Sequence, residues 1–461
     1  MSFAFSQHRL HPLGQGLPDK ERISALIAVM LAVCVASLDT AIANTALPTI
    51  AASLQASDAS SIWVVSAYQL AMVACLLPAA SLGEVMGHRR VFMAGLILFT
   101  VASLACGLAP SLPWLVGARL VQGVGAAGVM AINGALLRYI YPSASLGRGM
   151  GVNAMVVGLS FAAGPTAASA VLLLGSWHWL FLINVPICLL AMYFGLRGLP
   201  QTSRATYRFD AVAAGLCAAV LGLLVLGLGE GAHQATWLTV GIELGLAAIC
   251  LALLMWRQAG HPAPMLAVDL LKRPVFALSA ATAVCSFAAQ GLAFVSLPFM
   301  LQHVLGYSQV DTGFLLTPWP VVVSALAPFA GRLSDRHPAG LLCGVGLAVL
   351  SLGLMLLATM PDVPSVFDIT WRMAVCGAGF GFFQSPNLRA IMNAAPPARS
   401  GGASGMIATV RLMGQAIGAA LVAACFHASS SQGAILALWV AAGFAGVAAL
   451  ASVARLRFKT M

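Results

Sequence analysis

A small group of charged and polar side chains lies inside long apolar segments of this sequence: Asp39, Arg119, Gln122, Glu243 and Arg411. An ionisable group at such depth is costly, so it is a functional candidate by default. Asp39 stands about eight residues from the end of its segment, roughly 12 Å deep at 1.5 Å per residue. Loss of hydration favours the neutral carboxyl group, so Asp39 is predicted to bind and release a proton. The alternative is a structural carboxylate that neighbouring hydroxyl groups satisfy.

The two arginines have different settings. Arg119 and Gln122 are three residues apart, so a helix places them on one face. A guanidinium group keeps its charge, so Arg119 can tune the proton affinity of a nearby carboxylate but does not relay a proton itself. The alternatives for Arg119 are a structural ion pair and a side chain that reaches toward the outer surface. Arg411 lies near the middle of its segment and is expected to pair with an acid or with backbone carbonyl groups, or to contact a solute.

The composition identifies the solvent of these segments. Hydrophobic residues make up 60% of the 461 residues, charged residues 8%, and the mean hydropathy is +0.94. A soluble protein carries about a quarter charged residues, so lipid must surround most of this chain. The apolar runs are continuous rather than alternating, which excludes a β-barrel. Helices of about 20 apolar residues must therefore position the candidate residues.

We predict an all-α integral membrane protein with 14 transmembrane helices. The predicted spans are 23–46, 61–82, 91–109, 112–138, 148–174, 178–197, 210–229, 236–256, 274–301, 312–333, 339–360, 367–391, 402–426 and 433–455. All Lys and Arg residues except Arg119, Arg372 and Arg411 fall in every second connection or at the two tails. This distribution predicts a multi-pass protein of the cytoplasmic (inner) membrane with both termini in the cytoplasm. It also accounts for the net charge of +10 without a nucleic-acid partner.

An internal repeat relates the two ends of the chain at a spacing of about 250 residues. Leu47-Pro48 recurs as Leu297-Pro298, the segment ending in Glu84 recurs as the one ending in Asp335, and Arg119 recurs as Arg372. The repeat predicts a six-helix bundle at 1–208, an inserted two-helix linker at 209–260 and a second six-helix bundle at 261–461. Related halves of this kind are a transporter architecture, with the solute site at their interface.

Six segments resemble signature motifs of the major facilitator superfamily, specifically of its fourteen-helix drug:proton antiporters. They are Leu38-Asp39-Thr40-Ala41-Ile42-Ala43-Asn44-Thr45-Ala46-Leu47-Pro48, Gly83-Glu84-Val85-Met86-Gly87-His88-Arg89-Arg90, Arg119-Leu120-Val121-Gln122-Gly123-Val124-Gly125, Gly158 through Gly164-Pro165, Trp177-His178-Trp179-Leu180-Phe181-Leu182-Ile183-Asn184-Val185-Pro186, and Arg411-Leu412-Met413-Gly414. The resemblance covers nearly the whole chain. It implies a major-facilitator-type fold, multidrug efflux, and roles for Asp39 and Arg119 in proton coupling.

The first loop motif departs from the family pattern. It has Glu84-Val85 where Asp-Arg is usual and His88 where Arg is usual. The second copy is closer to the pattern, so a gating salt bridge built on Asp335 and Arg336 has more support from the motifs than one assigned to the first loop.

These observations assign the candidate residues to three roles. Proton coupling is assigned to Asp39, Arg119 and Glu243, although Glu243 lies in the inserted pair and a packing role is its alternative. Substrate binding is assigned to Asp39, Gln122, Arg411, Trp63, Tyr68, Phe161, Phe294, Trp319 and Phe383, whose rings can hold lipophilic cations or simply face lipid and other helices. Gating is assigned to Gly83, Glu84, Gly87, Arg89, Arg90, Gly331, Asp335, Arg336, Gly158, Gly164 and Pro165.

The sequence thus predicts a monomeric transporter that exchanges lipophilic, cationic drugs or quaternary ammonium compounds for protons by alternating access. Its partners are small organic solutes, protons and the bilayer. No Walker motif and no metal-ligand spacing occurs in the sequence, so the proton gradient is expected to drive transport without a cofactor or a metal. The alternatives are an exporter of a metabolite or anionic compound, with Arg411 and Arg119 as binding residues, and a non-transporting membrane sensor or a membrane enzyme.

Overall fold

A computed structural model describes residues 15–56, 61, 63–232, 237–261, 264–266, 268–307, 309–361, 363–429 and 432–457. Every element within these ranges is a helix. The first group comprises α1 (Asp19–Ser53), α3 (Trp63–Met86), α4 (His88–Gly107), α5 (Leu112–Ile140), α6 (Leu146–Leu174), α7 (Trp179–Leu182) and α8 (Asn184–Gly198). Two further helices, α9 (Ala211–Ala232) and α10 (Trp237–Arg257), occupy the predicted inserted linker.

The second group follows the linker. It comprises α11 (Val268–Leu271), α12 (Pro274–Phe299), α13 (Gln309–Leu316), α14 (Pro318–Ser334), α15 (Ala339–Ala358), α16 (Val366–Ala394), α17 (Ser400–Ala428) and α18 (Gly433–Ala454). Three short turns of 3-10 helix adjoin these helices: η1 (Ser143–Ser145) precedes α6, η3 (Pro397–Arg399) precedes α17, and η4 (Arg455–Arg457) follows α18. A π-helical turn, η2 (Met300–Val304), follows α12.

The length and apolarity of these helices identify a multi-pass membrane protein. Eleven helices of the described chain are long and apolar enough to cross a membrane. Each of the predicted spans overlaps a helix, but α9, α16 and α17 are not among the eleven. Charged side chains at Asp368, Arg372 and Arg389 make α16 less apolar than the other helices.

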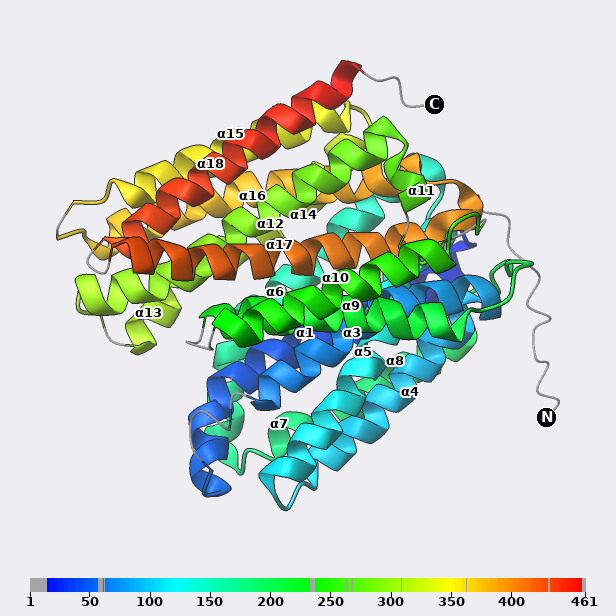
Figure 1. Ribbon diagram of the computed structural model, residues 1–461, viewed down its shortest axis with the longest axis horizontal. Helices are drawn as coiled ribbons and strands as arrows, with labels where there is room; N and C mark the ends of the chain where they lie inside the picture. Colours follow the sequence, from blue (N-terminus) through cyan, green and yellow to red (C-terminus); the bar gives the residue numbers. More distant parts are fainter. Residues whose placement is uncertain are drawn as a thin grey trace.

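The helices form two groups that meet along a seam (Figure 1). In the first group α5 packs against α3 and α4, while α1 packs against α6 and α8. In the second, α12 packs against α17 and α18, and α16 packs against α14 and α15. The groups touch where α6 lies along α14 and where α17 lies along α3 and α5. The pair α9 and α10 covers one edge of this seam, because α9 contacts both α3 and α17.

Glycines allow the helices to approach closely within each group. A Cβ atom on Gly125 of α5 would stand 2.5 Å from the backbone nitrogen of Phe99 in α4, and one on Gly95 would stand 2.9 Å from Cα of Gly128. In the second group a Cβ atom on Gly346 of α15 would stand 2.8 Å from the carbonyl oxygen of Gly379 in α16. Lipid offers helices no hydrophobic driving force for association, so such backbone contacts supply the van der Waals energy that holds the bundle together.

Gly125→Val is expected to lower the melting temperature of the purified protein, because the new side chain must push apart the backbones of α4 and α5. Overpacking of this kind costs about 1–3 kcal/mol. Gly117→Val on the same helix is the matched control, since a Cβ atom there would meet nothing within 4 Å. Equal melting temperatures for the two variants would contradict the close contact.

Candidate functional site

Asp39 lies inside the first group of helices, where its side chain is bound from two other helices. Its residue is 2% exposed. From α5, Arg119 donates through Nη1 to Oδ2 of Asp39 in an ion pair, and Gln122 donates through Nε2 to Oδ1 at 3.0 Å. From α8, Asn184 donates through Nδ2 to Oδ1 at 2.8 Å. A charged pair and two amides therefore satisfy a carboxylate that has lost its hydration, as a buried ion requires.

The guanidinium group of Arg119 is held by further contacts. Its Nε donates to the carbonyl oxygen of Val64 at 2.9 Å, and its Nη1 donates to Oε1 of Gln122 at 2.7 Å. The ring of Tyr68 lies 4.2 Å from the Arg119 Cζ atom, in a cation–π contact. Gln122 also donates to the hydroxyl oxygen of Ser103 on α4 at 2.9 Å. Five helices of the first group, α1, α3, α4, α5 and α8, thus converge on one ion pair.

The network unites residues that the sequence singled out separately. Asp39, Arg119, Gln122 and Tyr68 are all in it. The alternative prediction was that hydroxyl groups satisfy the Asp39 carboxylate. This was wrong, because its described partners are a guanidinium group and two amides. Asn184 was missed as a site residue, although it stands in the Trp177–Pro186 motif. Ser103 was also missed, and no sequence signal marks it.

A second polar region lies between the two groups. A cavity of about 60 Å³ there is lined from α5, α6, α12, α16 and α17, and Arg411 is part of its lining. Arg411 was expected to pair with an acid or with backbone carbonyl groups, or to contact a solute. No ion pair to it occurs in the described part of the chain, and its buried Nε atom has no hydrogen-bond partner there. Asn133 and Asn153, hydrogen-bonded to each other at 2.8 Å, also line this cavity and were missed.

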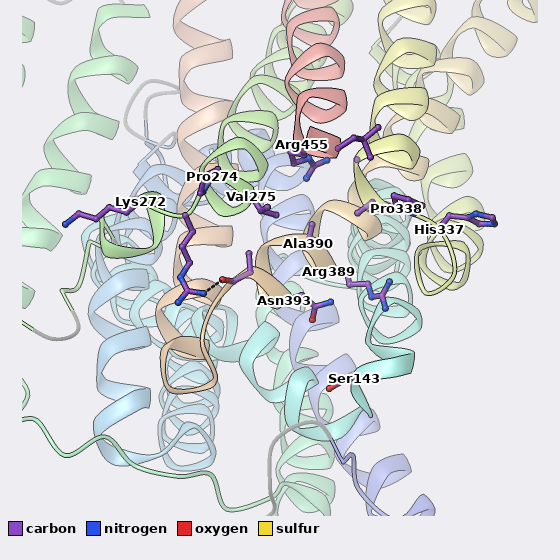
Figure 2. A pocket seen from close by; sticks show the side chains of 15 residues that line it. Ser143, Lys272, Pro274, Val275, His337, Pro338, Arg389, Ala390, Asn393 and Arg455 are labelled. Carbon is purple, nitrogen blue, oxygen red and sulfur yellow. Dashed lines mark hydrogen bonds between the residues drawn. The ribbon is translucent and has the colours of Figure 1, made fainter. Parts of the chain in front are cut away.

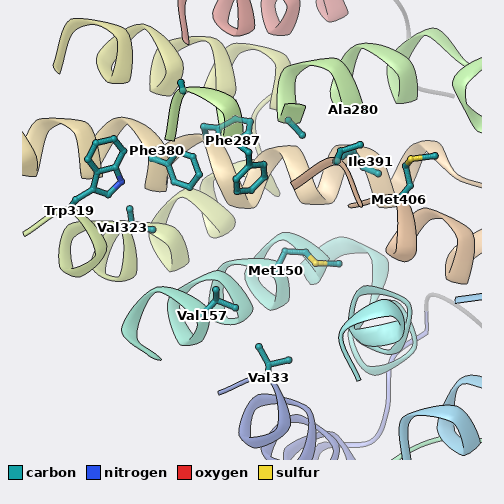
Figure 3. Packing of buried hydrophobic residues seen from close by; sticks show 14 of the residues in the cluster. Val33, Met150, Val157, Ala280, Phe287, Trp319, Val323, Phe380, Ile391 and Met406 are labelled. Atoms are coloured by element: carbon teal, nitrogen blue, oxygen red, sulfur yellow. The ribbon is translucent and has the colours of Figure 1, made fainter. Parts of the chain in front are cut away.

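The predicted aromatic residues are dispersed rather than gathered around one cavity. Trp319 and Phe383 are buried in the second group, where the Phe380 ring contacts Trp319 in a tilted arrangement and Phe383 edge-on. In this conformation they face other helices rather than a solute cavity, as Figure 3 shows for Trp319 and Phe380. Phe294 contacts the Trp319 ring at a centroid distance of 5.1 Å. Phe287, which was missed, lines the small cavity instead.

Two further aromatic residues, Trp63 and Phe161, lie on the surface of the first group and are each 44% exposed. Glu243 lies on α10, where its Oε2 atom faces Gly227 of α9. Since α10 packs on α9 and belongs to the inserted pair, the structure does not bring Glu243 to the Asp39 network.

At the end of the molecule that carries the basic connections, Glu84 joins the two groups. Its carboxylate, 3% exposed, accepts from Nη1 of Arg399 at 3.0 Å and from the backbone N–H of Gly402 at 2.7 Å. Gly402 lies in the first turn of α17, so the carboxylate also meets the positive end of that helix. Tyr207, from the connection that leads to α9, donates to Oε2 of Glu84.

Asp335 makes the corresponding contact in the opposite direction. Its Oδ1 accepts from the backbone N–H of Gly147 at 3.0 Å, in the first turn of α6, and lies 3.4 Å from Nε of Arg389. Of the two residues favoured for a gating salt bridge, Asp335 forms one with Arg389, whereas Arg336 is exposed and takes no part in it. The first loop also has an ion pair, because Glu84 pairs with Arg399 even though its motif departs from the family pattern.

Burial and charge shift the pKa values of three groups at this end. Burial by itself lowers the pKa of Arg399, but hydrogen bonds and charge from Asp269 and the charge of Glu84 outweigh it, so the pKa is raised. Burial and the nearby Glu84 raise the pKa of Tyr207. Burial also raises the pKa of Asp335, although Arg389 and backbone N–H groups of α6 oppose this shift.

The remaining predicted gating residues have simpler roles. Gly331 and Gly158 lie on the α6–α14 seam. A Cβ atom on Gly331 would stand 3.0 Å from Cα of Gly151, and one on Gly158 would stand 2.6 Å from the Ser324 hydroxyl oxygen. Gly83 lies close to Ile132, and Gly164 lies close to Ala41 of α1. Gly87 precedes α4 with a φ of 95°. Arg89 donates to the Leu196 carbonyl oxygen at 2.8 Å, and Arg90 is exposed. The side chain of Pro165 lies outside the described ones.

Comparison with known proteins agrees with this architecture. The family model of the Major Facilitator Superfamily matches residues 29–419. The chain is 48% identical over 443 residues to the Uncharacterized transporter YebQ of Escherichia coli K12, covering 96% of this chain and 97% of that relative. It is 32% identical to the Multidrug resistance protein Stp of Mycobacterium tuberculosis CDC 1551, covering 92% of this chain and 78% of that relative.

Among solved structures, the fold is similar to that of the human organic anion transporter MFSD10 (TETRAN), with a TM-score of 0.69. That comparison has 14% sequence identity and covers 95% of this chain and all of that one, so it bears on the fold alone.

Asp39→Asn is expected to destabilise the protein by about 3–5 kcal/mol, because it leaves the buried Arg119 charge without its counter-ion. The double substitution Asp39→Asn with Arg119→Gln should recover part of this loss, since no unpaired charge then remains. Thermal unfolding of the wild type, both single variants and the double variant measures the coupling. Strictly additive losses would contradict the ion pair.

Arg399→Gln is expected to separate the ends of α3 and α17, because it leaves the buried Glu84 without its cation. Spin labels carried on unnatural amino acids at Met86 and Pro397 would report the distance. We expect the population of the longer distance to rise at least about tenfold, since a tenfold change needs only 1.4 kcal/mol. Arg336→Gln, at an exposed position of the same end, should leave the distance distribution unchanged; a reversed ranking of the two variants would rule out the assigned gate.

Proposed function

This chain belongs to the major facilitator superfamily, and on that premise we propose that it exports lipophilic, cationic compounds in exchange for protons. It is a transporter and not an enzyme. We further propose 14 membrane spans, with halves at 1–208 and 261–461, an inserted pair at 209–260, and both termini on the cytoplasmic side of an inner membrane. The basic end described above is then the cytoplasmic end.

The observation that carries the proposal is the buried, fully bonded carboxylate of Asp39. In the ionised form it accepts from Arg119, Gln122 and Asn184, which joins α1, α5 and α8. A proton on Asp39 cancels its attraction to Arg119 and converts one acceptor oxygen into a donor. Protonation therefore changes which arrangement of these helices is more stable, and this difference is what allows a proton to shift a conformational equilibrium.

The two carboxylates at the basic end supply the element that must open and close. Glu84 binds the start of α17 and Asp335 binds the start of α6, and each contact crosses between the halves. Loading of a solute from the cytoplasm requires both contacts to break. Closure of this end, as in the present structure, fits a state that faces the outside or is occluded.

The solute is proposed to bind between the halves. The cavity of about 60 Å³ is far below the roughly 300–1,000 Å³ of a drug-sized pocket, so it must widen as the halves separate. Relatives named multidrug resistance proteins support a lipophilic drug, and a relative named a riboflavin transporter supports the metabolite alternative. One monovalent cation leaving for one entering proton moves no net charge, so the pH gradient alone would drive that exchange.

A second candidate function is export of an anionic compound or metabolite. Arg411 favours it, because a cation that lines the interface cavity without an ion pair among the described residues attracts an anionic solute. The same charge would repel a cationic drug at close range.

In proteoliposomes with an imposed inward proton gradient, Asp39→Asn is expected to lower gradient-driven export at least about tenfold, because the coupling carboxylate can no longer accept a proton. Asp311→Asn, an exposed acid at the start of α13, should retain wild-type export and is the matched control. Equal gradient-driven flux in the wild type and Asp39→Asn would remove Asp39 from the coupling role.

Competition between solutes distinguishes the two candidate functions. If the solute is cationic, quaternary ammonium dyes should inhibit export, and Arg411→Gln should strengthen their binding because a repelling charge is lost. If the solute is anionic, organic anions should compete instead and Arg411→Gln should weaken their binding. Inhibition by anions only, together with loss on Arg411→Gln, would overturn the cationic proposal.

A further inference from the structure

A large cavity opens at the basic end of the second half, apart from the Asp39 network and the interface cavity (Figure 2). Its volume is about 1,050 Å³. It lies between the starts of α12 and α15 and the ends of α16 and α18. In Figure 2, Arg389, Asn393 and Arg455 lie near its middle, and Lys272 and His337 extend outward on its two sides. The cationic lining residues are Lys272, Arg273, Arg389 and Arg455, the imidazole of His337 also lines it, and no Asp or Glu occurs among the described residues that line it.

Most of this positive charge has no carboxylate partner. No ion pair to Lys272, Arg273 or Arg455 occurs in the described ranges. Arg273 donates to the carbonyl oxygen of Ala394 at 3.1 Å, and Arg455 donates to neutral oxygens of its own half. Arg389 has Asp335 at 3.4 Å, yet its buried Nε atom makes no hydrogen bond within the described structure. The lining is therefore strongly cationic.

Two helix starts add to this charge. The helix α12 begins at Pro274 and α15 at Ala339, and both residues line the cavity. Neither helix has a side-chain hydrogen bond at its N-cap. The first N–H groups of a helix lack partners within it and carry partial positive charge. A cavity with cationic side chains and two helix starts presents donors suited to a phosphate group.

The position of the cavity indicates where such a phosphate comes from. Pro274 and Ala339 are the first residues of two candidate membrane spans, and Arg457 is the last residue of a third. The cavity therefore lies at the level where apolar spans give way to the polar headgroups of a bilayer. Pro274, Val275 and Leu456 give its lining an apolar part next to the cations. Basic pockets between helices at this level suit acidic lipid headgroups.

We propose that this cavity binds a phosphate group, and that the headgroup of an acidic phospholipid supplies it. Ser143, from η1 of the first half, also lines the cavity, so the bound headgroup touches both halves at the end where Asp335 holds Gly147. A lipid bound there stabilises the closed cytoplasmic end. This site is independent of the proton-coupled function proposed above, because it binds without transport.

Native mass spectrometry of the full-length purified protein tests the site with phosphatidylglycerol and phosphatidylcholine as probes. Wild type should bind phosphatidylglycerol more tightly than the zwitterionic lipid. The double variant Lys272→Gln/Arg273→Gln should bind phosphatidylglycerol about thirtyfold more weakly, from roughly 1 kcal/mol for each basic residue lost. The matched control is Arg204→Gln/Arg208→Gln, which removes two exposed charges from the same end outside the cavity and should bind like the wild type.

A second variant keeps every charge. Ala390→Phe fills part of the cavity and should also weaken phosphatidylglycerol binding, while an unchanged elution volume and melting temperature show that the variant is folded. Inorganic phosphate, added as a competitor, distinguishes a lipid from a soluble compound as the source of the phosphate group. If millimolar phosphate raises the melting temperature of the protein and phosphatidylglycerol is not preferred, the site binds a soluble phosphate compound and the lipid source is overturned. Equal loss of lipid in both double variants, or no binding of either probe, would overturn the site itself.

Discussion

The arrangement of the first half depends on one constraint, that a charge buried in a membrane protein must have its counter-charge and its hydrogen bonds supplied by the protein. Asp39 and Arg119 meet this condition together, and neither would be tolerated alone at that depth. Their pairing brings α1 against α5, and the amides of Gln122 and Asn184 bring α5 and α8 to the same point. The local geometry is therefore an arrangement that satisfies one ion pair.

The closed basic end follows a second rule, in which each half supplies an acid to the start of a helix in the other half. Glu84 meets α17 and Asp335 meets α6, positions related by the internal repeat. A carboxylate at a helix start gains from the partial positive charge there, and its arginine partner adds a charge-assisted bond. Because each acid and its helix belong to different halves, both contacts are lost whenever the halves separate at this end. The glycine contacts of α6 with α14 keep the backbones close on the same seam.

The two halves resemble each other in helix order but differ in what fills them. The first contains the ionic network, whereas the second contains the edge-to-face and tilted rings of Phe287, Phe380 and Trp319. Arg372, the repeat partner of Arg119, pairs with Asp368 on its own helix. The two halves therefore differ in chemistry: a buried ion pair joins helices of the first, whereas aromatic contacts fill the second.

The sequence by itself determined the membrane setting, the places of the helices and the presence of charged groups, Asp39 and Arg119, inside apolar segments, because apolar length and charge are properties of a short segment. It also indicated the repeat, since matched motifs keep their order along the chain. Only the tertiary structure decided which side chains meet. Asn184 joins Asp39 across 145 residues, Arg399 joins Glu84 across 315, and Trp319 turns into a core rather than a cavity. Such partners depend on how whole helices rotate and approach each other, and no local pattern of residues contains that information.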